Sequence, residues 1–214
     1  NINWLMMVRE PIQSCESWVL NSFRNNDYKN IAIRIFQMLF EIDQVIFQNK
    51  NYVGVRLEDL KEHPDETIKA LCGWLGIKEH KCLYQMTVQG KKWWGDPTSP
   101  DFTKDGMRPF EKTSINRKLG LVFSKKDQFI LRTLFYPFSV HFGYVKENLE
   151  QFKNDLKEIR PMLDQIFDFE KEIVLNKKMN IEKFMKSGPY LFLRSGMIER
   201  WSTLNKLYTY PNML

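Results

Sequence analysis

The sequence predicts an α/β fold, in which part of a parallel sheet is flanked by helices and followed by an α-helical C-terminal extension. Trp4 to Val8 is an apolar run without polar alternation, which is typical of a strand buried in a parallel sheet. Tyr52 to Arg56 predicts a second strand, and helices between the two runs indicate a right-handed crossover. From about residue 148, apolar side chains recur every three or four positions. We therefore expect an α/β domain over residues 1–147 and a helical extension over residues 148–214.

Each further element has a local signal. Pro11 cannot donate to a ladder, so the chain turns there and a helix is expected over residues 12–24. A second helix is expected over residues 28–48, and a third begins at Pro64 and stops at Gly76. Later helices are expected from Ser124 to before Pro137, over Ile181–Met185 and over Leu191–Leu207, the last two separated by Gly188-Pro189.

The composition is that of an ordinary globular chain with an excess of positive charge. The 214 residues are 43% hydrophobic and 27% charged, with a net charge of +6 and a pI of about 9.1. Residues 91–126 hold nine Lys or Arg against four acidic residues, a net excess of five positive charges. This balance suits an anionic ligand without requiring nucleic acid. A solvated loop is the equally weighted alternative for that segment.

Cysteine usage and hydropathy bear on the compartment. The three cysteines, Cys15, Cys72 and Cys82, give no disulfide framework, which favours a reducing, cytoplasmic location. Cys72, His80 and Cys82 lack the paired spacing of a zinc site, so no metal is expected. No apolar stretch approaches the roughly 18 residues of a membrane span.

Residues 91–109 have no usable period and predict a long ordered loop. Trp93 and Trp94 within it either form a lid or acceptor wall or anchor the loop to the core. The anchoring interpretation is slightly favoured.

Arg9 and Ser17 are the strongest candidates for a binding site. Arg9 follows the first strand, and Ser17 lies eight residues on, within the helix that follows. Ligands bind at the carboxyl edge of open α/β sheets. A guanidinium there, with a hydroxyl nearby, is suited to gripping a phosphate.

These residues resemble the 3′-phosphate-binding element of sulfotransferases that use 3′-phosphoadenosine 5′-phosphosulfate (PAPS). The match rests on Val8-Arg9-Glu10-Pro11 followed by Ser17. Two further segments are similar to family motifs: Glu58-Asp59-Leu60 with Pro64 and Trp74-Leu75-Gly76, and Phe142-Gly143-Tyr144. The resemblance covers roughly residues 4–145.

The resemblance implies a P-loop-like fold and sulfonate transfer from PAPS to a hydroxyl or amine, without a metal. Arg9 and Ser17 would hold the 3′-phosphate of PAPS or of its product PAP. Asn116-Arg117-Lys118-Leu119-Gly120 partly resembles the family's Arg-Lys-Gly segment, which closes on that phosphate. Arg117 and Lys118 are therefore further candidates, although Leu119 stands in the glycine's place.

The family's Gly-rich, lysine-bearing loop is not found in this sequence. We therefore expect the chain to be the C-terminal portion of a longer enzyme, with its catalytic residues upstream of Asn1. Two alternatives stay open. One is a P-loop-type kinase, which would need a Walker lysine and Mg²⁺. The other is a non-catalytic binding or assembly module that oligomerises through the C-terminal helices.

Overall fold

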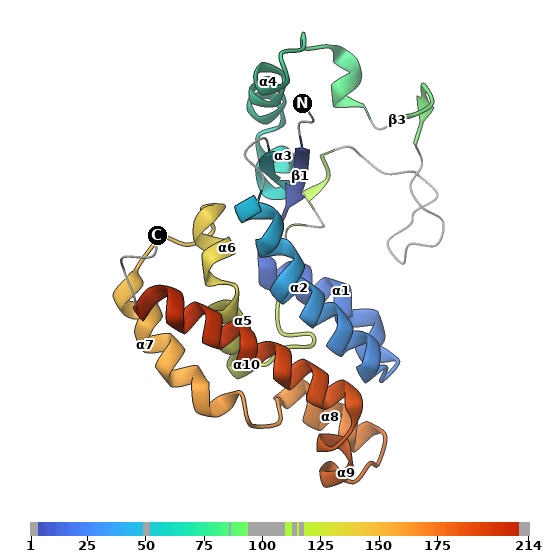
Figure 1. Cartoon of the computed structure of the whole chain (residues 1–214). Coiled ribbons are helices and arrows are strands. Elements are labelled where there is room, and N and C mark those ends of the chain that lie inside the picture. The colour runs from blue at the N-terminus through green and yellow to red at the C-terminus, as the bar shows by residue number, and fades with distance from the viewer. Residues whose placement is uncertain are drawn as a thin grey trace. The chain divides into compact units, whose positions relative to one another are not determined.

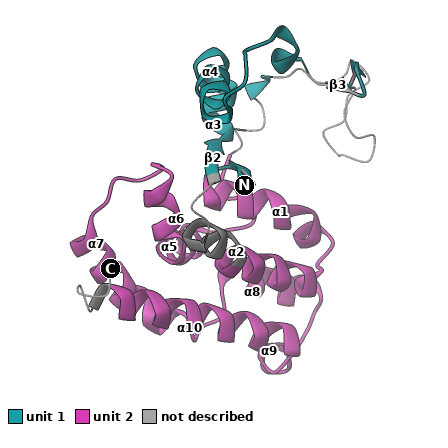
Figure 2. Cartoon of the chain, turned by 45° about the horizontal axis from the view of Figure 1, so that its top comes forward, with its two compact units in different colours: residues 1–9, 51–117 teal, residues 10–50, 118–214 magenta. Residues whose placement is uncertain are grey.

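Figure 1 shows the computed structural model, which describes residues 4–48, 52–85, 87–93, 110–112, 115 and 118–209. The protein is mostly helical (67%) with a small two-stranded parallel sheet, in agreement with an α/β fold in general terms. Two compact units are distinguished in Figure 2. Unit 1 is Asn1–Arg9 with Asn51–Arg117, and unit 2 is Glu10–Lys50 with Lys118–Leu214. Unit 2 thus joins the C-terminal tail, residues 148–214, with the segments 10–50 and 118–147.

Unit 1 is built around the parallel pair of strands. It contains β1 (Trp4–Val8), β2 (Tyr52–Arg56), α3 (Leu57–Glu62), α4 (Pro64–Leu75), a 3₁₀ turn (Lys81–Tyr84), β3 (Thr87–Val88) and β4 (Lys91–Lys92). In the β1–β2 ladder Trp4 lies opposite Tyr52 and Val8 opposite Arg56. Gly76 ends α4 with a φ of 68°, and the N–H of Ile77 donates to the carbonyl of Cys72. Both strands and the stop at Gly76 confirm the prediction.

The burial predicted for β1 is wrong. Trp4, Leu5 and Met7 are 54%, 49% and 50% exposed, whereas Val8 is buried. Successive residues of a strand point to opposite faces, so apolar surface is exposed on both faces of β1. Within the described residues β1 pairs with β2 alone. An apolar pattern predicts a strand, but burial also requires neighbouring strands and covering layers.

Unit 2 is helical. It contains α1 (Pro11–Arg24), α2 (Tyr28–Gln48), α5 (Lys125–Leu134), α6 (Tyr136–His141), α7 (Leu149–Ile159), a 3₁₀ turn (Arg160–Met162), α8 (Asp168–Asn176), α9 (Ile181–Met185) and α10 (Gly188–Thr209). The predicted helices at α1, α2 and α9 are confirmed. The helix after Ser124 ends before Pro137 as predicted, but Pro137 then lies in the first turn of α6, which the sequence analysis does not predict. Pro189 lies in the first turn of α10, so that helix begins earlier than the sequence predicts.

The main hydrophobic core lies within unit 2 and draws on α1, α2, α5, α7, α8 and α10. The tail docks on the rest of the unit mainly where α10 packs against α2. Gly196 permits the close approach, because a Cβ there would lie 2.5 Å from the ring of Phe36. That ring stacks on Phe192, with centroids 4.3 Å apart.

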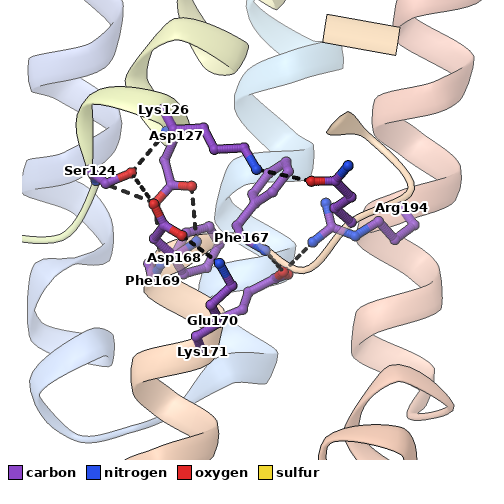
Figure 3. A network of polar contacts seen from close by, with 10 residues as sticks. Ser124, Lys126, Asp127, Phe167, Asp168, Phe169, Glu170, Lys171 and Arg194 are labelled. Atoms are coloured by element: carbon purple, nitrogen blue, oxygen red, sulfur yellow. Dashed lines mark hydrogen bonds and ion pairs between the residues drawn. The ribbon is translucent and has the colours of Figure 1, made fainter. Parts of the chain in front are cut away.

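Two buried carboxylates hold α8 in place (Figure 3). Asp127 accepts hydrogen bonds from the backbone N–H groups of Asp168 (3.1 Å) and Phe169 (3.2 Å). Burial raises the pKa of Asp127, and these bonds oppose the rise. The second carboxylate, Glu170, pairs with Arg194 and accepts from the backbone of Phe167 at 2.8 Å.

Tyr28 completes the second group by donating to Glu170 at 2.5 Å, so α2, α8 and α10 meet at one carboxylate. Burial raises the pKa of Glu170, while the Arg194 guanidinium opposes this change. The pKa of the Tyr28 hydroxyl is also raised by burial and by the neighbouring carboxylate. The carboxylate of Glu170 is therefore paired with a cation and hydrogen-bonded inside the core.

Candidate functional site

Arg9 lies at the carboxyl end of β1, as the sequence predicts. Because Val8 is opposite Arg56 in the parallel ladder, Arg9 and Leu57 follow the two strands at the same edge of the sheet. The first residue of α3 is Leu57, so this helix starts at that edge. Arg9 itself is half-buried. This sheet edge in unit 1 is the position where α/β proteins place ligand-binding groups.

Arg9 lies near a second cation, Lys61 on α3. Burial lowers the pKa of Lys61 and the charge of Arg9 adds to this effect, whereas the Glu111 carboxylate opposes it. Lys61 donates to the backbone carbonyl of Glu111 at 2.6 Å, a neutral acceptor. Arg56 at the same edge is charge-compensated, since it forms two hydrogen bonds to Asp59 at 2.8 and 2.5 Å. Arg9 and Lys61 thus place two cationic groups near this edge, and positive charge in such a position attracts an anion.

Asp59 and its neighbour Glu58 lie in the first turn of α3. The pairing of Asp59 with Arg56 agrees with the structural role that the sequence indicates for this acidic pair, rather than with acid–base chemistry.

Ser17 lies on α1 in unit 2, as predicted, and is half-buried. The helix begins at Pro11, and the side chain of Glu10 caps it by accepting from the N–H of Gln13 at 2.6 Å. Glu16, which precedes Ser17, faces the interior and is only 3% exposed. The guanidinium of Arg34 lies over the ring of Trp18, which follows Ser17.

Glu16 joins α1 to the chain that precedes α5. Its carboxylate accepts hydrogen bonds from the backbone N–H groups of Gly120 (3.1 Å), Val122 (2.8 Å) and Phe123 (2.9 Å). Gly120 has a φ of 99°, a conformation that favours glycine. We refer to these bonds as the Glu16–backbone contact. All of its members belong to unit 2.

The contact brings two predicted site segments together. Ser17 follows Glu16 directly, and Lys118 lies two residues before Gly120. Lys118 is exposed, while Leu119 packs against the hydrophobic core and fixes the backbone beside it. The candidate residues are therefore divided: Arg9 is in unit 1, and Ser17 and Lys118 are in unit 2. Arg117 lies outside the described residues.

Sequence reasoning missed Glu16. The signal was available, because Glu16 lies four residues after Ile12 and three before Val19, which places it on the apolar face of α1. A carboxylate on a buried face requires hydrogen-bond donors. The donors themselves are more than one hundred residues away in sequence, and no local pattern identifies them.

The other predicted features have simple positions. Gly143 has a φ of 69° and Tyr144 donates to the carbonyl of Ser139, so Phe142-Gly143-Tyr144 ends α6. Trp93 is 37% exposed, whereas Trp94 and most of the predicted loop lie outside the described residues.

Across the described part of the chain there is no group of three or more His, Cys, Asp or Glu suited to a metal ion. None of the described helices is long and apolar enough to cross a membrane.

Comparison with known proteins gives no further assignment: no family model matches the chain, and no curated protein or solved structure matches it.

Proposed function

We propose that this chain forms the 3′-phosphate-binding part of a sulfotransferase that transfers a sulfonate group from PAPS to a hydroxyl or amine acceptor. The observation that supports this most is the position of Arg9 at the carboxyl edge of the β1–β2 sheet, beside the cationic Lys61. The helix that follows has Ser17 on it, and the Glu16–backbone contact brings the Lys118 segment to the same helix.

In this proposal the chain recognises charge and does not itself perform the chemical step. Arg9 supplies a planar fork of donors, Ser17 a hydroxyl and Lys118 an ammonium, and all three suit phosphate oxygens. The acceptor oxygen or nitrogen attacks sulfur while the bond from sulfur to the bridging oxygen of PAPS breaks, and PAP leaves. A general base takes the proton of the acceptor. Free thiols at Cys15, Cys72 and Cys82 support a reducing compartment for this enzyme.

The direct test is calorimetric titration of the protein with PAP and with AMP, which lacks the 3′-phosphate. We expect PAP to bind more tightly than AMP. Arg9→Ala should weaken PAP binding by about 2 kcal/mol or more, roughly thirtyfold, through loss of a charge-assisted contact. Arg9→Lys, which keeps the charge but loses the fork, should fall between the two.

Arg132→Ala is the matched control, since Arg132 is an exposed arginine on α5. It should leave both affinities unchanged. Equal affinities of the wild-type protein and Arg9→Ala for PAP would remove Arg9 from the site. Equal affinities of the wild-type protein for PAP and AMP would refute the proposed function.

A second function, an assembly module without nucleotide affinity, is favoured by one observation. The exposed Trp4, Leu5 and Met7 of β1 offer apolar surface of the kind that mediates association. Sedimentation analysis with and without PAP separates the two functions. Concentration-dependent association in a protein that binds no PAP would favour the assembly module.

A further inference from the structure

The carboxylate of Glu16 on α1 binds backbone N–H groups of a segment more than one hundred residues away in sequence. This carboxylate is almost completely buried, and a buried carboxylate is costly unless it is paired or hydrogen-bonded. The backbone N–H groups of Gly120, Val122 and Phe123 supply these bonds. The contact therefore fixes the backbone of residues 120–123 to α1 at one defined place.

The same backbone is fixed again on its C-terminal side. Gln128 donates to the carbonyl of Phe123 at 2.9 Å, and Ser124 caps α5 by accepting from the N–H of Asp127. The side chain of Phe123 is completely buried. Residues 120–124 are thus held both by α1 and by α5, and Lys118 is the exposed residue just before this fixed part.

The backbone N–H groups in this contact are occupied by Glu16, so they are not available to bind an anionic ligand. The N–H of Gly120 donates to both carboxylate oxygens of Glu16, and those of Val122 and Phe123 donate to one of them. A phosphate next to α1 would therefore be recognised by side chains, namely the Ser17 hydroxyl and the Lys118 ammonium. Side chains on a flexible backbone lose more entropy on binding than those on a fixed backbone.

We propose that Glu16 is a positioning residue for 3′-phosphate recognition: by holding residues 120–123 on α1, it keeps Lys118 beside Ser17. The inference rests on the proposed function and adds a specificity determinant to it. Glu16 does not touch the nucleotide. It acts through the Lys118 backbone, so its effect is confined to ligands that contain the 3′-phosphate.

The test measures discrimination between PAP and AMP as well as affinity. In Glu16→Gln the amide retains one neutral acceptor oxygen in place of the charged carboxylate, and it presents an NH₂ group to the N–H of Gly120. We expect PAP affinity to fall about tenfold and AMP affinity to change less than about twofold, a loss typical of one charge-assisted contact. Hydrogen exchange of the amides of Gly120, Val122 and Phe123 should also become faster, because their acceptor is weakened.

A double-mutant cycle links Glu16 to Lys118. Lys118→Ala alone should lower PAP affinity, and in its background Glu16→Gln should lower it by less than about twofold more. Glu170→Gln is the matched control, because Glu170 is also a buried carboxylate that accepts a backbone hydrogen bond in unit 2. It should destabilise the protein while leaving the ratio of PAP to AMP affinity unchanged.

Two results would overturn the inference alone. One is a Glu16→Gln protein that loses PAP and AMP affinity equally, which is the behaviour of a residue with a purely structural role. The other is unchanged exchange of the amides of Gly120, Val122 and Phe123 in Glu16→Gln. A wild-type protein that fails to discriminate PAP from AMP would instead refute the proposed function, and the inference would fall with it.

Discussion

Within the described residues, unit 1 and unit 2 differ in how far their apolar side chains are buried and in how many polar side chains lie in the interior. The buried polar side chains all belong to unit 2: Glu16, Ser22, Asp127, Thr133, Ser139, Glu170, Arg194 and Arg200. Their partners come from helices far apart in sequence, as when Tyr28 donates to Glu170. In unit 1 the strand β1 exposes large apolar side chains on both faces. Many buried polar groups of unit 2 thus find partners within that unit, whereas β1 in unit 1 keeps three large apolar side chains exposed among the described residues.

This difference bears on function. The residue with the clearest ligand-binding position, Arg9, lies in the less enclosed unit, while Ser17 and Lys118 are held by the well-packed one. Binding residues commonly lie on connecting segments supported by a rigid scaffold. In unit 2 the scaffold is the helical core, and the Glu16–backbone contact fixes the segment next to Lys118 to that core.

The largest effect that we expect comes from breaking the triad in unit 2. Glu170→Ala leaves the Arg194 guanidinium buried without its carboxylate, and loss of one partner of a buried pair costs about 3–5 kcal/mol. Denaturant unfolding followed by circular dichroism measures the loss as a lower midpoint at unchanged slope. Lys171→Ala, which breaks the exposed pair with Asp168, should cost at most about 1 kcal/mol. Similar losses in the two variants would contradict a buried triad as the source of the stability of unit 2.

An intermediate effect should appear in the cysteines, because Cys15 is buried in unit 2 and Cys72 in unit 1. Burial, followed by the nearby carboxylates, raises the pKa of the Cys15 thiol, so its reactive thiolate forms only after unfolding. We expect thiol labelling, mapped by mass spectrometry, to modify exposed Cys82 in native protein. With added denaturant Cys72 should follow, and Cys15 should react last. Labelling of Cys72 and Cys15 at the same denaturant concentration would show that the two units unfold together.

Local signals in the sequence predict much of the secondary structure and the positions of two candidate site residues. The apolar runs predict β1 and β2, and the turn at Pro11 and the glycine stop at Gly76 predict the helix ends beside them. Arg9 and Ser17 lie where this local reasoning places them, at a strand end and on the following helix.

Long-range contacts could not be predicted in this way. Glu16 and its backbone donors are separated by 104 to 107 residues, and Tyr28 and Glu170 by 142. The hydrophobic periodicity of a sequence does not indicate which residues will meet over such separations. The exposure of β1 has the same origin, because a strand pattern does not state how many strands will pair beside it. The division between two units likewise depends on which distant segments pack together.

The smallest expected effect tests the exposure of β1 directly. Leu5→Thr keeps a residue that favours strands and removes exposed apolar surface, so it should change the free energy of unfolding by less than about 0.5 kcal/mol. Val8→Ala is the matched control on the same strand; because Val8 is only 4% exposed, it should cost about 1.5–3 kcal/mol. Both are measured by urea unfolding followed by circular dichroism. If Leu5→Thr proves as costly as Val8→Ala, Leu5 is covered in solution by polypeptide outside the described residues. Unit 1 would then be as enclosed as unit 2, and the contrast between the two units would disappear.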